Sequence, residues 1–326
     1  MAAGQPPRRS DLPNVPDVPA LADVPDRMVA WCHQRLGSAP VASLMAPSLQ
    51  MAAVYGLALA DGRRVAVKVR NEDVTRAGSC VRAQRAAADR GFPCPRPLTD
   101  AELFDGAVLH AEEWCPGGRL LRGHDRRTAE AFAVLLARLV LLLKKVSVAP
   151  PLPNPPWVRW DHGGATTWPA QAFLDERDQS LLPPFVEEVA RRATARLQAT
   201  DLPCLLGHLD WETQNLRWNG WTPYVVHDWD SVGWLPEAAI AGAASGTFSS
   251  AETPTLAALD SSRSFLHAYQ QQRGEPFTDE ETQVAWAASL WPAAHNARGQ
   301  SLFARPPVAL SALEAQAAER LALADA

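Results

Sequence analysis

Long hydrophobic runs and an excess of basic charge are both missing from this sequence. The most apolar stretch, residues 131–143, is shorter than a bilayer requires and contains Arg138, so it predicts a buried helix rather than a membrane span. The 326 residues carry a net charge of −5 and a pI near 5.9, which gives no overall basic surface for nucleic acid. We therefore expect neither a membrane nor nucleic acid as a partner.

Cysteine is scarce and follows no recognisable spacing. The five cysteines are an odd number and no pair has C-x-x-C spacing, which argues against a disulfide scaffold and against a zinc site. Such cysteine usage fits a reducing compartment. The N-terminal residues have no apolar segment typical of a signal peptide, so we expect a cytoplasmic protein.

The composition is that of an ordinary globular protein with an unusual start. Hydrophobic residues make up 47% and charged residues 21%, and the length suffices for one large domain or two moderate ones. Residues 1–25 are rich in proline, which predicts a flexible or extended tail. Because the pattern of elements changes after the break at Pro116, we expect a first lobe at 26–116 and a second lobe at 117–326.

The first lobe is predicted to be a small mixed sheet with one main helix. Two of its apolar runs are joined by Asp61–Gly62, residues that suit the positive φ angles of a tight primed turn. A second turn at Asp105–Gly106 precedes another apolar run. The expected helices are 28–36 and 74–90, and the expected strands are 54–60, 64–69 and 107–113.

The second lobe is predicted to be mainly helical with one embedded hairpin. The hairpin turns at Asn219–Gly220, between strands expected at 215–218 and 223–228. The expected helices are 128–146, 186–199, 258–273, 278–297 and 309–323. The fold class is therefore α+β, with a small β-sheet N-lobe and a mainly helical C-lobe.

Polar residues cluster at the hairpin and in the loop that precedes it. His208, Asp210 and Asn215 follow the apolar Leu205–Leu206, and Asp228 directly follows the second hairpin strand. A phosphoryl-transfer site needs one carboxylate to orient the attacking hydroxyl and accept its proton, and it needs oxygen ligands for Mg²⁺. A loop that supplies Asp and then Asn, followed by a hairpin that supplies another Asp, can place all three around one nucleotide.

This loop resembles the His-Gly-Asp-x4-Asn motif of the aminoglycoside phosphotransferase and choline kinase superfamily. Val226–Gly233 is similar to the Ile-Asp-Trp/Phe-x4-Gly motif that follows it in that family. The resemblance implies a bilobal protein-kinase-like fold and a small-molecule kinase whose acceptor is an alcohol group. It implies Asp210 as the catalytic base and Asn215 and Asp228 as metal ligands. His208 would act beside the base by shaping its loop.

The resemblance extends into the first lobe and implies a cofactor, ATP or GTP with Mg²⁺. Lys68, at the end of Arg64–Val69, would hold the α- and β-phosphates. The segment Glu112–Gly117 is similar to the hinge that reads adenine through backbone groups, here Glu113, Trp114 and Cys115. The likeness covers roughly residues 48–300.

The sequence departs from the family in the helix expected at 74–90. That helix contains no Glu, the residue with which family members hold the phosphate-binding lysine. Gln84 is the expected occupant, with Cys80 as an alternative, and Glu72 or Asp73 could substitute from the helix start.

Two further departures concern loops. The loop 43–53 has no glycine to cradle phosphate, so Ser48 and backbone amides would have to donate to it. Leu209 replaces the usual glycine of the catalytic motif. Asp230 is either a second metal ligand or a surface carboxylate. We place the ligand at Asp228 because the family has its Asp just after the apolar strand.

The acceptor is not named by the sequence. We expect the acceptor to be an aminoglycoside-like antibiotic or an amino sugar, which would connect the protein to antibiotic resistance. Choline or ethanolamine is the next alternative. Trp211 and Trp234 are either core residues or a wall for such a substrate. A rival interpretation is a non-catalytic, pseudokinase-type nucleotide-binding protein, which the missing helix Glu favours. The oligomeric state is left open between monomer and homodimer.

Overall fold

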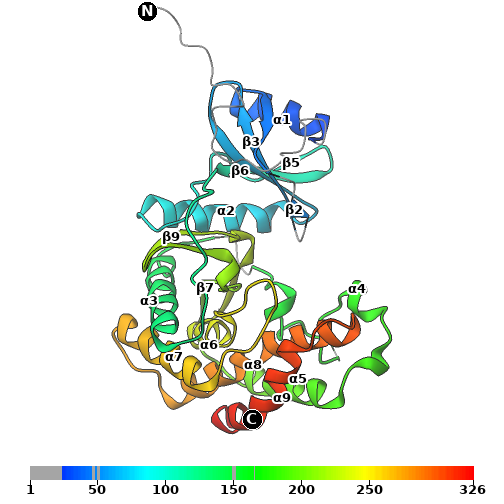
Figure 1. Cartoon of the computed structure of the whole chain (residues 1–326), viewed down its shortest axis with the longest axis vertical. Coiled ribbons are helices and arrows are strands. Elements are labelled where there is room, and N and C mark those ends of the chain that lie inside the picture. The colour runs from blue at the N-terminus through cyan, green and yellow to red at the C-terminus, as the bar shows by residue number, and fades with distance from the viewer. Residues whose placement is uncertain (1–23, 46–47, 50–51, 149–151, 165) are drawn as a thin grey trace, which may run out of the picture. The chain divides into compact units, whose positions relative to one another are not determined.

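The structure, a computed structural model, describes residues 24–45, 48–49, 52–148, 152–164 and 166–326. Most of the expected tail, up to residue 23, and part of the loop 43–53 lie outside these residues. By their internal contacts the residues form two compact units (Figure 1). The first is the chain up to Val74 with Arg96–Trp114, and the second is Thr75–Pro95 with Cys115–Ala326.

The first unit is a sheet covered by one helix. Its strands are arranged in the order β1-β3-β4-β6-β5, with β2 also pairing with β3. Every pair among the described strands is antiparallel, so the prediction of a mixed sheet is wrong. The elements are α1 (Asp26–Leu36), β1 (Pro40–Ser43), β2 (Ser48–Leu49), β3 (Ala53–Leu59), β4 (Arg64–Arg70), β5 (Glu102–Phe104) and β6 (Ala107–Glu113).

The two faces of this sheet have opposite character because side chains alternate along each strand. One face is apolar: Val67 and Leu109 pack with Trp31 of α1 in the core of the first unit. The alternate positions carry Lys68 and Glu112, on neighbouring strands β4 and β6. A shift of either strand by one residue would exchange the faces, so the apolar core fixes where the polar side chains lie.

The turns of the sheet differ from expectation at one place. Between β3 and β4 only Gly62 has a positive φ, of 87°, and Asp61 does not, so the turn is not the expected primed type. The primed geometry occurs instead between β5 and β6, where Asp105 has a φ of 49° and Gly106 a φ of 76°. Both turns join antiparallel neighbours, β3 to β4 and β5 to β6.

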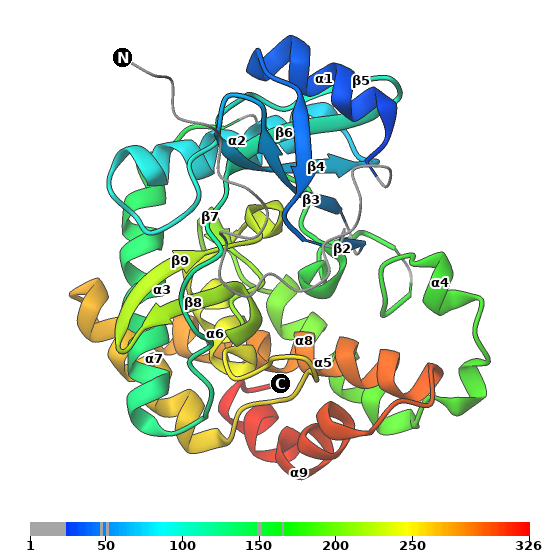
Figure 2. The same cartoon turned by 45° about the horizontal axis from the view of Figure 1, so that its top comes forward.

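The second unit is mainly helical, as predicted. Helix α3 packs against α7, α6 against α8, and α8 against both α5 and α9 (Figures 1 and 2). The described helices include none that is long and apolar enough to cross a membrane. The elements are α2 (Val74–Asp89), α3 (Arg126–Leu143), α4 (Ala172–Asp175), α5 (Pro184–Gln198), α6 (Glu237–Thr247), α7 (Leu259–Arg273), α8 (Asp279–Leu302), α9 (Val308–Leu323), β7 (Cys204–His208), β8 (Leu216–Asn219), β9 (Thr222–Val226) and β10 (Val232–Pro236).

Helix α2 belongs by its contacts to the second unit, although it precedes β5 and β6 in the chain. Ala83 and Ala87 of α2 are part of the large core of that unit. Arg76 donates from Nη2 to the backbone oxygen of Asp230 at 2.8 Å, and the Cys80 thiol approaches the oxygen of Val232 at 4.0 Å. These contacts attach α2 to the segment that follows β9.

Helices α6 and α8 approach so closely that only glycine fits at their crossing. A Cβ atom on Gly242 would lie 2.1 Å from the backbone oxygen of Ala285. We expect Gly242→Ala to lower the free energy of unfolding by about 1 to 3 kcal/mol, because backbone cannot move aside as a flexible side chain can. Gly299→Ala is the matched control, since a Cβ there meets nothing within 4 Å. It should be neutral or raise stability by up to about 1 kcal/mol in urea titrations. An equal loss of unfolding free energy in both variants would contradict the close approach of α6 and α8 at Gly242.

His295 on α8 gives the fold a pH dependence. Burial, and then the charge of Arg298, lower the pKa of His295 from 6.5 to about 4. Its Nε2 contacts Gln171 Oε1 at 2.9 Å. The folded protein therefore holds the ring neutral, so its contribution is complete above pH 6.5 and is lost as the pH falls toward 4. The loss amounts to about 1.4 kcal/mol per pH unit within that window.

Urea unfolding of wild type and His295→Gln at pH 7.5 and 5 tests this dependence. We expect the variant to lose less stability than wild type on acidification, because other buried titratable groups are common to both. His33→Gln, at an exposed position of α1, is the control and should behave as wild type. An equal acid loss in wild type and His295→Gln would contradict the assignment.

Candidate active site

The loop between β7 and β8 is held by its own side chains and by its neighbours. His208 ends β7, and its Nδ1 accepts from the backbone N–H of Asp210 at 3.3 Å. Its Nε2 therefore carries the proton and donates to the backbone oxygen of His227 at 2.9 Å. His208 thus connects the loop to the end of the hairpin.

Asp210 and Asn215 are brought together by a short turn of 3-10 helix, Thr213–Asn215. The Asn215 side-chain nitrogen donates to Asp210 Oδ2 at 2.7 Å and to the Asp210 backbone oxygen at 2.9 Å. The loop is tied to the core on either side, because the Trp211 indole donates to the Phe132 oxygen at 3.1 Å. The carboxylate is therefore fixed in one orientation before any ligand binds.

Asp228 comes from the other end of the hairpin and has unusual backbone geometry. Its φ of 59° and ψ of 50° are left-handed, which is uncommon outside glycine. Its Oδ2 accepts from the Ser231 hydroxyl at 2.8 Å. The backbone N–H of His227 donates to the Asn215 backbone oxygen at 2.8 Å, so the hairpin delivers Asp228 beside the loop that carries Asp210.

Three acidic residues share this small region, and nearby negative charge raises the cost of ionising Asp210 and Glu212. Burial raises the pKa of Asp210 to about 7, with a second contribution from Asp228, and the hydrogen bond from Asn215 opposes both. The pKa of Glu212 is also raised well above its usual range. Burial is the larger cause, and the negative charge of Asp210 is the second. Carboxylates crowded in this way attract a cation, which would lower both pKa values.

The donor set fits a magnesium ion. Mg²⁺ takes oxygen ligands, and usually only one or two come from carboxylates while substrate phosphates and water complete the set. Asp228 offers carboxylate oxygens, and Asn215 offers its side-chain oxygen because its nitrogen is committed to Asp210. Among the described residues no cluster of three His, Cys, Asp or Glu side chains could hold a metal by itself.

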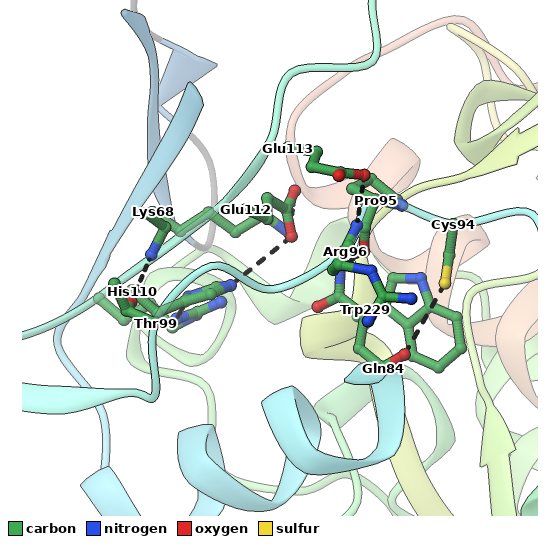
Figure 3. A network of polar contacts seen from close by, with 12 residues as sticks. Lys68, Gln84, Cys94, Pro95, Arg96, Thr99, His110, Glu112, Glu113 and Trp229 are labelled. Carbon is green, nitrogen blue, oxygen red and sulfur yellow. Dashed lines mark hydrogen bonds and ion pairs between the residues drawn. The ribbon is translucent and has the colours of Figure 1, made fainter. Parts of the chain in front are cut away.

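Lys68, the residue expected to hold phosphate, lies in a buried polar network of the first unit (Figure 3). Its Nζ is 3.6 Å from Glu112 Oε1 on the neighbouring strand. His110 Nε2 lies 3.6 Å from the other Glu112 oxygen, and Arg70 Nη1 donates to His110 Nδ1 at 2.8 Å. The lysine therefore has a carboxylate partner within its own sheet.

The other residues expected to bind nucleotide are placed as follows. Gln84 is buried and donates to the Pro95 oxygen at 2.8 Å (Figure 3). Glu113, at the end of β6, accepts from the Arg96 backbone N–H at 3.3 Å. Trp114 packs over Gly56, where an added Cβ would lie 2.7 Å from its ring. Cys115 follows at the start of the second unit's main segment, and Ser48 lies in β2, its side chain outside the described atoms.

The two tryptophans beside the loop have different environments. Trp211 is fully buried and lies edge-on to His208, with ring centroids 5.6 Å apart, so it is a core residue. Trp234 on β10 is only partly buried, and its backbone N–H donates to the Asn154 side chain at 2.8 Å. Of the two, only Trp234 retains surface that a substrate can reach.

Comparison with known proteins decides the family. A profile of the phosphotransferase enzyme family, APH, matches residues 52–258, which is more than half of the chain. The chain belongs to this family. The protein is therefore a small-molecule kinase, and its bilobal kinase-like α+β fold class, inferred from the sequence, is confirmed. A search of curated protein sequences found no match.

Solved structures show the same fold as this phosphotransferase. The amicoumacin kinase hAmiN, in complex with AMP-PNP, Ca²⁺ and Ami, superposes with a TM-score of 0.58 at 14% identity over 85% of each chain. A putative fructosamine-3-kinase from Thermobifida fusca YX-ER1 superposes with a TM-score of 0.53 at 18% identity, and the match covers 91% of this chain and 99% of that chain. Spectinomycin phosphotransferase APH(9)-Ia, in complex with ADP and spectinomycin, superposes with a TM-score of 0.53 at 11% identity, and the match covers 92% of this chain and 93% of that chain. At these identities the likeness concerns the fold alone.

Two side chains of this phosphotransferase were missed as site residues by sequence reasoning. Glu212 lies two residues after Asp210, and its Oε2 accepts from the Gln214 side chain at 2.9 Å. Glu112 was noted only as the start of the hinge segment, and its pairing with Lys68 depends on strand register.

Proposed function

We propose that this phosphotransferase transfers the γ-phosphoryl of Mg·ATP, or Mg·GTP, to a hydroxyl of a small molecule that also carries an amine. An aminoglycoside-like antibiotic or an amino sugar is the acceptor we favour. The observation that carries the proposal is the constellation of Asp210, Asn215 and Asp228 with a further buried carboxylate, Glu212, beside it.

The chemistry rests mainly on Asp210. Held by Asn215, its carboxylate orients the acceptor hydroxyl and takes its proton as the oxygen attacks the γ-phosphorus and the bond to the leaving ADP or GDP breaks. When bound, Mg²⁺ would supply charge neutralisation at the phosphate oxygens, and Asn215 and Asp228 would hold it. Lys68 would bind the α- and β-phosphates, and His208 keeps the loop in position through its two hydrogen bonds. Most of the rate enhancement comes from positioning.

Glu212 favours an acceptor with an amine. It is buried, and no Lys, Arg or His of the described chain forms an ion pair with it. A buried carboxylate without a cationic partner is costly unless a ligand supplies the positive charge. An ammonium group near the reacting hydroxyl would do so. The solved structures named above include an amicoumacin kinase and a spectinomycin phosphotransferase, and antibiotics are therefore the first panel to test.

Matched acceptors test this substrate class. We expect ADP or GDP release with aminoglycosides or glucosamine and much weaker release with their N-acetylated forms, which keep every hydroxyl but lose the charge. Glu212→Gln should raise KM for the aminated acceptor about tenfold or more, because a charge-assisted hydrogen bond is lost. Equal turnover of free and N-acetylated acceptors would contradict the amine, and turnover of choline in their place would favour a choline or ethanolamine kinase.

A further inference from the structure

The lysine expected to bind phosphate is paired with a carboxylate across the sheet. In the register of β4 and β6, Lys68 lies opposite His110 and Ala66 lies opposite Glu112. Glu112 is therefore the diagonal neighbour of Lys68 on the same face, within reach of a long side chain. The Lys68 Nζ to Glu112 Oε1 distance is 3.6 Å, and the two residues are only 5% and 3% exposed.

A chain of polar residues supports Glu112 from behind. His110 is fully buried. Its burial is the main cause that lowers its pKa, and the positive charge of Arg70 is the second, so the ring is neutral. Arg70 Nη1 donates to its Nδ1 at 2.8 Å, which leaves the proton on Nε2, the atom 3.6 Å from Glu112 Oε2. Arg70 Nε lies 3.3 Å from Glu72 Oε1. Charges of opposite sign thus alternate along the row, with the neutral ring in the middle.

This row supplies what the sequence of α2 lacks. Helix α2 has no Glu, and by its contacts it belongs to the second unit. A buried ammonium requires a carboxylate nearby, because an unpaired charge in the interior is strongly unfavourable. Glu112 meets this requirement inside the unit that carries Lys68.

We propose that Glu112 is the positioning residue for Lys68 and replaces the helix carboxylate used elsewhere in the family. The inference rests on the proposed function, in which Lys68 binds nucleotide phosphates. The consequence is mechanical: the register of β4 and β6 sets the position of Glu112 beside Lys68. Glu112 acts through the lysine and is not itself a catalytic residue.

Glu112→Gln tests the proposal, since it keeps the size of the side chain and removes its charge. We expect the Kd of Mg·ATP to rise about tenfold or more, with little change in KM for the acceptor, because a charge-assisted contact to the lysine is lost. Glu102→Gln is the control: Glu102 also forms an ion pair in this sheet, but with Arg35 on α1. It should leave nucleotide affinity unchanged.

A second readout follows the lysine directly. Loss of the carboxylate favours the neutral amine, so Lys68 of Glu112→Gln should react faster with an amine-directed acylating reagent at pH 8, as measured by peptide mass spectrometry. Glu102→Gln should leave the rate of Lys68 acylation as in wild type. An unchanged rate in Glu112→Gln would overturn the pairing even if Lys68 proved to have no part in nucleotide binding.

A double-mutant cycle with Lys68→Met separates this inference from the proposed function. If Lys68→Met binds nucleotide as wild type does, the role of Lys68 fails, while the acylation result still judges the pair. If Lys68 does bind nucleotide, Glu112→Gln should add no further loss in the Lys68→Met background. Should Glu112→Gln fail to fold, Lys68→Met/Glu112→Gln should fold, because no unpaired ammonium remains. The proposal would be overturned if Glu112→Gln bound nucleotide with wild-type affinity. It would also be overturned if Glu112→Gln caused the same loss of nucleotide affinity in the wild-type and Lys68→Met backgrounds, or if the double variant also failed to fold.

Discussion

Asp210→Asn should reduce kcat by about 10²- to 10⁴-fold, the range that a positioned general base contributes. The substitution is conservative in shape, and the new side chain still offers an oxygen to the Asn215 amide, which donates to Asp210 Oδ2 at 2.7 Å. What disappears is the group that takes the proton from the acceptor hydroxyl. Because this interaction matters only in the transition state, the Kd of the nucleotide and the KM of the acceptor should change little.

Single-turnover and steady-state assays of ADP release, together with nucleotide titration, provide the measurement. The control is Asp201→Asn, which removes an exposed carboxylate shortly before β7. It should retain wild-type kcat. Turnover by Asp210→Asn within a few-fold of wild type would remove Asp210 from the role of base. A large loss accompanied by loss of nucleotide binding would assign it to structure or to metal binding instead.

The second large effect is expected at Asp228. Asp228→Asn should raise the Mg²⁺ concentration needed for half-maximal turnover and reduce turnover by more than about 100-fold, beyond the loss typical of residues that only support a metal ligand. The hairpin fixes this carboxylate close enough to raise the pKa of Asp210, and Ser231 holds its Oδ2 at 2.8 Å. Removing its charge therefore weakens the site for the ion and for the nucleotide that the ion carries.

Asp230→Asn is the matched control, two residues along the same segment. The backbone oxygen of Asp230 accepts from Arg76, an interaction that the substitution keeps. We expect a Mg²⁺ requirement close to that of wild type, measured by titrating Mg²⁺ at fixed nucleotide. If Asp230→Asn had the larger effect, the metal ligand would be Asp230 and the preference for Asp228 would be wrong.

The sequence predicted best those elements whose pattern is local. Strand β6 has the bounds expected for it, 107–113, because turn residues precede an apolar run and Pro116 follows it. Helix α7 begins one residue from expectation and ends at Arg273, before Gly274. The motif from His208 to Asn215 belongs to the same class, because its residues contact one another across a single short loop.

What the sequence did not predict depends on tertiary context. Helix α6 was missed because it is buried on every side, so its Ala- and Gly-rich sequence has no amphipathic period to recognise. The antiparallel order of the first sheet required strand pairing across intervening segments, and β1 and β2 lie beside a loop with no strong pattern. Propensity and periodicity carry no information about such pairing.

The site shows the same division. The residues predicted from one contiguous motif lie together, and the Asn215 side chain contacts Asp210. A partner for Lys68 was sought on the helix where the family places it, and the carboxylate of Glu112 on an adjacent strand was not considered. A diagonal cross-strand pair is visible only once the register is known. Glu212 was overlooked because its importance comes from burial rather than spacing.

The central claim is phosphoryl transfer to an aminated, hydroxylated small molecule, and label transfer tests it most directly. The protein would be incubated with Mg²⁺ and γ-labelled ATP or GTP over aminoglycosides, amino sugars, their N-acetylated forms, macrolides, choline and homoserine, with Asp210→Asn in parallel. We predict label on a hydroxyl of an aminated acceptor with wild type, and essentially none with Asp210→Asn. Failure to bind either nucleotide, or transfer that continues unchanged in Asp210→Asn, would contradict the account.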